Sequence, residues 1–194
     1  MIPEQKPEPG GFDCDGTGRL EALFAKKKLI LFIYTSFFGM GVLWHALPLT
    51  YPIMRFITPW VLLIFGIFIF LSAVPEGGKR LLLWGAGTYL VTFIIEAIGV
   101  ATGKVFGVYT YGDVLGFKLL EVPLLIGFNW TVVILGIASF VTRYIKNRVL
   151  AGLLIAVGAV LFDVIMEPIA MALDYWHWSN GVIPVQNYDA WFVI

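Results

Sequence analysis

Three acidic residues lie within apolar stretches of the sequence, namely Glu96, Asp163 and Glu167. An ionisable side chain inside hydrocarbon is costly to bury and is therefore a candidate for function. Asp163 and Glu167 are four residues apart, so on a helix they share one face and can act as a pair. Desolvation and mutual repulsion favour protonation of at least one of the acids. A carboxylic acid that stays protonated at neutral pH is what general acid catalysis requires.

Other polar and aromatic side chains can complete a pocket around these acids. The candidates for substrate binding are Asn129, Trp130, Tyr109, Tyr111, Trp176 and His45. The ring face of an aromatic residue can stabilise a cation. Simpler structural roles stay open for two of these residues. An intramembrane asparagine such as Asn129 can form hydrogen bonds between helices, and a lone histidine near a helix end, such as His45, can be a cap or an interfacial residue. The aromatic residues equally fit the belt that lines membrane interfaces.

The composition indicates a membrane protein. Of 194 residues, 59% are hydrophobic and 13% are charged, whereas a globular domain carries about 25% charged residues. A soluble enzyme and a disordered chain are therefore excluded. The 13 basic residues balance the 13 acidic residues, so no excess charge favours nucleic acid as a partner. A single cysteine, Cys14, excludes an intrachain disulfide framework and a cysteine-based metal cluster.

Five apolar stretches have about the ~20 residues that a helix needs to cross a bilayer. They cover about residues 29–47, 57–74, 81–101, 123–145 and 150–173. Because backbone groups in lipid need internal partners, we predict an all-α, polytopic helical bundle. Residues 1–28 are predicted to be a polar tail and residues 29–194 a single membrane domain. The aromatic segment 174–194 is expected to be interfacial or re-entrant, or to begin a sixth helix.

Positive charge predicts the orientation, because Lys and Arg are enriched in cytoplasmic loops. With the N-terminus inside, ten of the 13 basic residues lie on the inner side, and the outer side holds Arg55, Lys104 and Lys118. The N-terminus is therefore predicted to be cytoplasmic. At a rise of ~1.5 Å per residue, this orientation places all three intramembrane acids in the outer half of the bilayer, at similar height.

Several catalytic motifs are absent from the sequence. Two histidines cannot supply the histidine-rich ligand sets of membrane di-iron enzymes, and no aspartate-rich motif for diphosphate and magnesium occurs. No GxGxxG motif opens a nucleotide-binding fold. The serines have no evident histidine and acid arranged around them. We therefore expect acid chemistry on an apolar substrate, with no metal and no cofactor.

Three blocks of sequence carry a family resemblance, in the order FIIEAIGVATGKVFGVYTYGDVLGFKLLEVPLLIGFNW, DVIMEPIAMALDYWHW and GVIPVQNYDAWF. Over about residues 85–192 the chain resembles the carotenoid hydratases, small polytopic membrane proteins of bacterial and archaeal carotenoid synthesis. The resemblance implies addition of water to a terminal double bond of an acyclic carotenoid end group, giving a tertiary alcohol. It implies a carotenoid in the bilayer as the substrate and the plasma membrane of a prokaryote as the location. Other enzymes of the carotenoid pathway stay open as partners.

The resemblance is limited to part of the chain. The first two apolar stretches match the family only in hydrophobicity. Family members are expected to continue beyond Trp191, which leaves open a further helix after Ile194.

The residues and the resemblance together suggest a mechanism for hydration. The pair Asp163 and Glu167 shares a proton, and one member protonates the less substituted alkene carbon. Glu96, with Asn129 as its orienting partner, holds and deprotonates the attacking water, while aromatic rings shield the cation. The sequence leaves open which carboxylate is the acid and which is the base. It also leaves open a lycopene-type cyclase, whose product keeps the mass of the substrate, and a non-catalytic carotenoid-binding protein or proton-coupled carrier.

Overall fold

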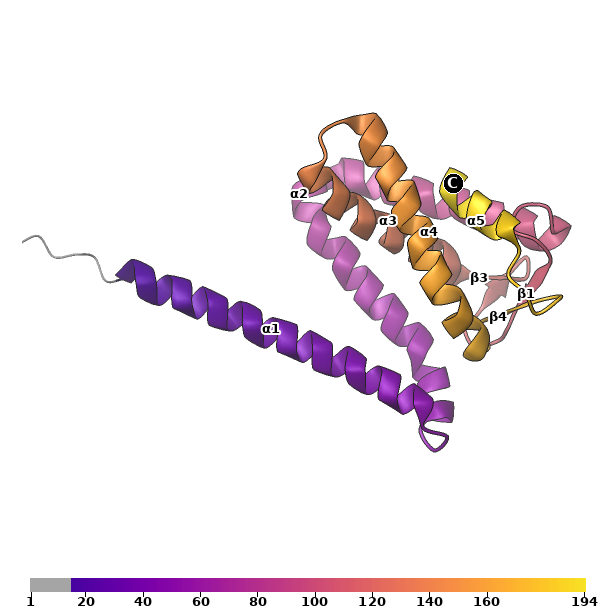
Figure 1. The fold of residues 1–194 in the computed structure, drawn as a ribbon, viewed down its shortest axis with the longest axis horizontal. Helices are drawn as coiled ribbons and strands as arrows, with labels where there is room; N and C mark the ends of the chain where they lie inside the picture. The colour runs from indigo at the N-terminus through magenta and orange to yellow at the C-terminus, as the bar shows by residue number, and fades with distance from the viewer. Residues whose placement is uncertain (1–14) are drawn as a thin grey trace, which may run out of the picture. The chain divides into compact units, whose positions relative to one another are not determined.

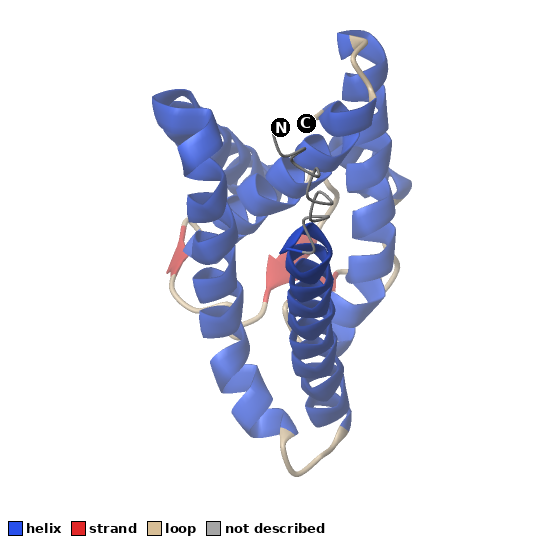
Figure 2. Cartoon of the chain, turned by 90° about the vertical axis from the view of Figure 1, so that its left-hand side faces the viewer, coloured by secondary structure: helices blue, strands red, loops and turns tan. Residues whose placement is uncertain are grey.

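The structure, a computed structural model, describes the backbone of residues 15–194 and the side chains of residues 28, 29 and 31–194. By its internal contacts the chain divides into two units, Met1–Tyr51 and Pro52–Ile194. Helices make up most of both units, and short strands occur only in the second unit of the described chain (Figure 2).

Helix α1 (Asp15–Ala46) belongs to the first unit and contains the apolar stretch Leu31–Ala46, where the first membrane span is predicted. The helix begins inside the stretch predicted to be a polar tail, of which residues 1–14 lie outside the described part. It ends shortly before Pro48, since a proline disfavours helical backbone in the residue before it. The Thr50 hydroxyl then donates to the free Trp44 carbonyl at 2.6 Å.

Helix α2 (Tyr51–Thr102) contains two of the predicted spans, 57–74 and 81–101. The helix is broken at Gly78, whose φ of 56° and ψ of −148° are not helical. A positive φ of this kind is readily adopted only by glycine, and Pro75 just before it removes a backbone donor. The two parts of α2 diverge from this bend (Figure 1).

Helices α3 (Leu124–Tyr144) and α4 (Arg148–Ala172) contain the last two predicted spans and pack against each other. Asn147 begins α4, and its side-chain oxygen accepts from the backbone N–H groups of Val149 and Leu150 at 3.0 Å each, as expected for a helix cap. Among the described residues, three helices, α2, α3 and α4, are long and apolar enough to cross a membrane. The prediction of a mostly helical chain with helices that could span a membrane is confirmed.

Four short strands in the described part of the chain were not predicted, and they join a fold that is otherwise helical. Strand β1 (Tyr109–Tyr111) pairs antiparallel with β4 (Trp176–Trp178), and β2 (Lys118–Leu119) pairs with β3 (Val122–Pro123). The β1–β4 ladder continues through Gly112, whose N–H donates to the Tyr175 carbonyl at 2.9 Å. A Cβ atom at position 112 would lie 2.1 Å from the backbone oxygen of Asp174. The close approach of the two segments therefore requires glycine.

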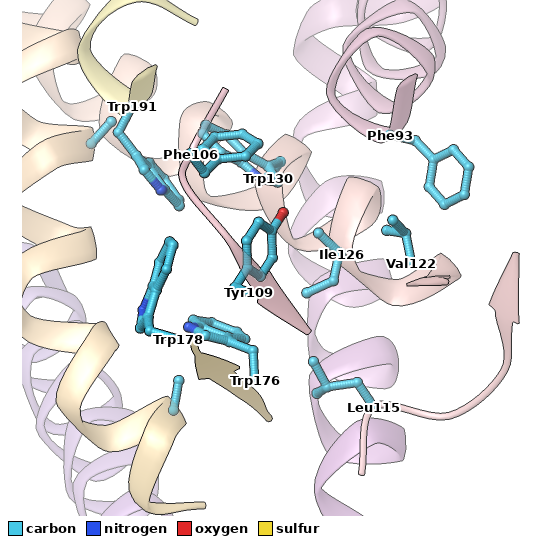
Figure 3. Close-up of a cluster of buried hydrophobic side chains, with 12 residues drawn as sticks. Phe93, Phe106, Tyr109, Leu115, Val122, Ile126, Trp130, Trp176, Trp178 and Trp191 are labelled. Atoms are coloured by element: carbon cyan, nitrogen blue, oxygen red, sulfur yellow. The ribbon is translucent and has the colours of Figure 1, made fainter. Parts of the chain in front are cut away.

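The C-terminal segment contains β4 followed by helix α5 (Val185–Val193), which starts after Pro184 and packs along α4. Helix α5 has nine residues, fewer than the ~20 that a helix needs to cross a bilayer. The buried aromatic cluster of the second unit lies where β1, β4, α3 and α5 meet (Figure 3). The outward faces of α2, α3 and α4 carry many exposed Leu, Ile and Phe side chains, as expected of surfaces that face lipid.

Candidate functional site

Glu96 lies in the second part of α2, and only 5% of its surface is exposed. Its Oε2 accepts hydrogen bonds from the hydroxyls of Tyr109 at 2.5 Å and Tyr111 at 2.8 Å. Its Oε1 accepts from the indole Nε1 of Trp130 at 2.8 Å. Both oxygens of this buried acid are thus met by donors, which offsets the loss of water around the carboxyl group.

Glu167 lies in α4 and is 2% exposed. Its Oε2 accepts from two indole N–H groups, those of Trp176 and Trp178, at 2.9 Å each. Its Oε1 accepts a longer bond of 3.3 Å from the amide of Asn187 in α5. Three consecutive elements, α4, β4 and α5, therefore meet at one carboxylate.

Asp163 lies one helical turn before Glu167 and is completely buried. Its Oδ2 accepts from the Asn187 amide at 2.5 Å, so one amide group contacts both acids of α4. Its Oδ1 is buried as well and has no hydrogen-bond partner in the described part of the chain. Such an unpaired atom is rare in a folded protein and calls for an explanation.

Strands β1 and β4 place four aromatic side chains between Glu96 of α2 and the acids of α4. We call Tyr109, Tyr111, Trp176 and Trp178 the aromatic ribbon. Tyr109 is opposite Trp178 and Tyr111 is opposite Trp176, so all four side chains project from one face of the pairing. The ring centroids of the two pairs are 5.0 and 6.0 Å apart. The tyrosines donate to Glu96 and the tryptophans donate to Glu167. The ribbon therefore connects both carboxyl groups.

The tyrosine hydroxyls of the ribbon stay protonated and so remain able to donate hydrogen bonds. Burial raises the pKa of the Tyr109 hydroxyl, and the neighbouring Glu96 charge raises that pKa further. The pKa of Tyr111 is raised for the same reasons. Both hydroxyls thus remain protonated at neutral pH and keep their hydrogen bonds to Glu96.

A further aromatic pair adjoins Glu96. The Trp130 ring stacks on Trp191 of α5, with centroids 3.6 Å apart and an angle of 18° between the planes. Phe106 packs against both Trp130 and Tyr109 (Figure 3). Aromatic faces thus surround the hydrogen-bonded acid.

A charged rim lies beside the aromatic ribbon and is defined as Arg55, Asp113, Lys118, Asp174 and His177. The Asp174 carboxylate pairs with Arg55 and, at 2.5 Å, with His177. Lys118 lies 2.8 Å from Asp113 and holds the pKa of that exposed carboxyl below its ordinary value. All ion pairs of the second unit that the structure describes belong to this rim. The three buried acids have no basic partner there.

An apolar groove of about 320 Å³ opens beside the buried network. It is lined by Ile95, Val105, Gln186, Asp189, Ala190, Val193 and Ile194. Ile95 directly precedes Glu96 in the sequence, and Ala190 directly precedes Trp191. No group of three His, Cys, Asp or Glu side chains among the described residues could hold a metal ion.

Seven of the nine site residues named from the sequence meet in this network: Glu96, Asp163, Glu167, Trp130, Tyr109, Tyr111 and Trp176. Asn129 does not join it, because its half-buried side chain makes none of the hydrogen bonds found in the described chain. The neighbouring Trp130 bonds Glu96 instead. His45 belongs to the first unit, where its Nδ1 lies 2.8 Å from the Gly41 carbonyl oxygen, and its predicted role is untested.

Three residues of the network were not named as site residues from the sequence: Trp178, Trp191 and Asn187. The two tryptophans could have been found from the sequence, since Trp178 alternates with Trp176 and both lie within the segment 174–194, which stands out for its aromatic content. Asn187 carries none, because one amide in a polar stretch is typical of many loops and caps.

We expect Glu167→Gln to lower the free energy of unfolding by about 1–3 kcal/mol, the cost of leaving a buried donor unpaired. Both oxygens of Glu167 face N–H groups that cannot accept. The best arrangement of glutamine keeps both indole bonds but turns its amide nitrogen towards the Asn187 amide. Thermal unfolding of the detergent-purified protein should show a lower Tm.

Glu76→Gln is the matched control for this variant, because Glu76 is exposed beside the bend of α2. The control should keep the Tm of the unmodified protein. Equal Tm values for Glu167→Gln and the control would contradict the prediction.

Comparison with known proteins adds to this geometry. A family model described as carotenoid biosynthesis protein matches residues 57–194. A curated relative, the bisanhydrobacterioruberin hydratase of Haloarcula japonica, is 30% identical over 143 residues, which cover 67% of this chain and 49% of the relative. The chain thus spans about half the length of that relative, and no solved structure matches it. Since the family match covers well over half of the chain and every residue of the buried network, the chain belongs to the family of carotenoid biosynthesis proteins.

Proposed function

We propose that the chain is a membrane enzyme that adds water to a terminal C=C bond of an acyclic carotenoid end group, without a cofactor, and forms a tertiary alcohol. The observation that carries this proposal is a buried network of three acids, built around aromatic faces, in which none of the described basic residues pairs with an acid. The family match and the name of the curated hydratase support it.

Hydration of a trisubstituted alkene requires a proton donor, protection of the resulting cation and a base for the attacking water. A proton from the pair Asp163 and Glu167 adds to the less substituted carbon, and the tertiary carbon becomes cationic. Water then forms the C–O bond and gives up one proton to Glu96. Glu96 then releases this proton and the pair takes up one proton, which restores both groups, so the net change is the addition of one water. Trp130, which bonds Glu96, takes the orienting role expected of Asn129.

The aromatic ribbon suits the cationic intermediate. A tertiary cation reacts with any available water or base, and aromatic faces stabilise positive charge without acting as nucleophiles. The ribbon lies between the two groups of acids, and its N–H and O–H groups already bond the carboxyl oxygens. The ring faces, which take no part in these hydrogen bonds, are the part of the ribbon that we assign to the cation. The apolar groove beside the network suits the isoprenoid chain behind the reacting end.

The proposed location is the plasma membrane of a prokaryote, with five spans and a cytoplasmic N-terminus. The spans are α1, the two parts of α2, α3 and α4. Lys79 and Arg80 then lie at the inner side, directly after the bend at Gly78. This arrangement agrees with the enrichment of positive charge in cytoplasmic loops. It also places the charged rim at the outer side.

The test of this function is co-expression of the full chain with a lycopene pathway, followed by mass spectrometry of the pigments. The expected result is a new pigment heavier than its precursor by one water, or by two if both ends react, and absent from the host with an empty vector. A new isomer of unchanged mass would replace hydration by cyclisation. Bound pigment of unchanged mass and absorption would indicate a binding protein instead.

A further inference from the structure

The donors around Glu167 indicate its protonation state. Two indole N–H groups and one amide N–H group point at its oxygens. None of these groups can accept a hydrogen bond. A proton on either oxygen would compete with a donor already in place, whereas an ionised carboxylate uses all three. The surroundings therefore favour the anionic form of Glu167.

The surroundings of Asp163 are different. Its Oδ2 accepts from Asn187, while its Oδ1 is buried without any partner in the described chain. A negative charge on a buried oxygen without donors is strongly disfavoured. A hydrogen on Oδ1 removes that charge and leaves the bond to Oδ2 intact. Two neighbouring buried carboxyl groups cannot both ionise and so share one proton, and Asp163 is the member whose contacts accommodate it.

Among the described residues, no cation acts on the pair of Asp163 and Glu167. The titratable groups whose charges act on Asp163 are Glu167 and Glu96, and Tyr188 of α5 adjoins both acids of α4. Each of these groups is neutral or negative. The ion pairs of the described part of the second unit use Asp113 and Asp174, which belong to the charged rim.

We propose that Asp163 holds the shared proton on Oδ1 and is the residue that protonates the alkene, and that Asn187 is the positioning residue that directs the proton there. Asn187 occupies Oδ2 of Asp163 and Oε1 of Glu167 with one amide group, which leaves Oδ1 as the free position for hydrogen. The role in protonation rests on the proposed hydration. In that step the O–H bond of Asp163 breaks, a C–H bond forms, and the alkene electron pair leaves a tertiary cation.

The location of the proton can be measured without any substrate. Infrared spectroscopy of the purified full chain in lipid nanodiscs at neutral pH should show the carbonyl band of a protonated carboxylic acid. The band should be missing in Asp163→Asn and present in Asp113→Asn, a control at an exposed acid of the charged rim. A band that survives Asp163→Asn, or no band in the unmodified protein, would overturn the assignment of the proton.

The positioning role of Asn187 has its own signature. Oδ2 is the carbonyl oxygen of a protonated Asp163, and it loses its hydrogen bond in Asn187→Leu. The carbonyl band should therefore move to higher wavenumber, since a free carbonyl group vibrates at higher frequency than a bonded one. In proteoliposomes kcat should fall about tenfold with KM unchanged, the loss expected for one hydrogen bond to a charged or reacting group. A merely structural residue would lower the folded yield without moving the band.

The two measurements separate the two proposals. Absence of any hydrated pigment from the unmodified protein would refute the proposed function, while the infrared band would still report on the proton. An unshifted band in Asn187→Leu would overturn the positioning role of Asn187, whatever pigment the enzyme makes.

Discussion

Asp163→Asn should lower the turnover of hydration by about 10²- to 10⁴-fold, the range that a general acid contributes. Asparagine has the shape of aspartate but no acidic proton, so the alkene loses its proton donor. The amide oxygen of the variant can accept the Asn187 bond in place of Oδ2. Its amide nitrogen takes the place of the Oδ1–H group, which in the protonated acid is already a buried donor without a partner in the described chain. The fold should therefore survive.

The measurement is hydrated product per amount of folded enzyme in proteoliposomes, with the folded fraction taken from size-exclusion chromatography. Asp113→Asn serves as the control, because it removes a carboxylate from the exposed charged rim and not from the buried network. The control should keep the turnover of the unmodified enzyme. Undiminished turnover in Asp163→Asn would remove this residue from the proposed chemistry.

The amide variants of the two acids of α4 are thus expected to have different effects, one mainly on stability and the other mainly on turnover. Glu167 is held by three N–H donors, so its replacement disturbs the contacts of β4 and α5 with α4. Asp163 is held by one donor, so its replacement changes chemistry more than packing. Loss of activity in Glu167→Gln is therefore weak evidence for a catalytic role, whereas loss of activity in folded Asp163→Asn is strong evidence.

The positions of the three acids could be predicted from the sequence because hydrocarbon makes charge conspicuous. Glu96 and Glu167 interrupt long apolar stretches, and helical spacing places Asp163 and Glu167 on one face. Tyrosines and tryptophans of one strand pair contact Glu96 and Glu167, while the similar depth of the acids in the bilayer stays a prediction. Because few ionisable residues lie inside the apolar stretches of a membrane protein, the candidates for a catalytic acid or base are few.

The connections between these acids could not be predicted from the sequence. Strands β1 and β4 pair although α3 and α4 lie between them in the sequence. Each strand has only three residues, and so short a pattern does not predict which strands pair. The same limit hides Asn187, which reaches Asp163 only after α5 folds back along α4. By contrast, the non-helical backbone of Gly78 separates two helical parts of α2, as the two apolar stretches of the sequence predict.

Glu96→Gln should also lower hydration by about 10²- to 10⁴-fold, the contribution of a general base. The change is well tolerated by the structure, because the hydroxyls of Tyr109 and Tyr111 can accept as well as donate. Glutamine can turn its amide nitrogen to these hydroxyls and keep its oxygen for the indole of Trp130, which can only donate. The variant should therefore fold and still bind substrate.

Deuterium exchange distinguishes the base from the acid. In D₂O the acid delivers a deuteron to the alkene carbon, and the resulting cation either takes up water or returns a proton to the acid. If Glu96 is the base for water, Glu96→Gln blocks only the first outcome, so recovered substrate should contain deuterium although no alcohol forms. Asp163→Asn should show neither deuterium nor alcohol. In this mechanism Asp163 acts before the cation forms and Glu96 acts after it. Loss of deuterium exchange in folded Glu96→Gln would therefore mean that Glu96 is needed for protonation of the alkene, and its assignment as the base would be wrong.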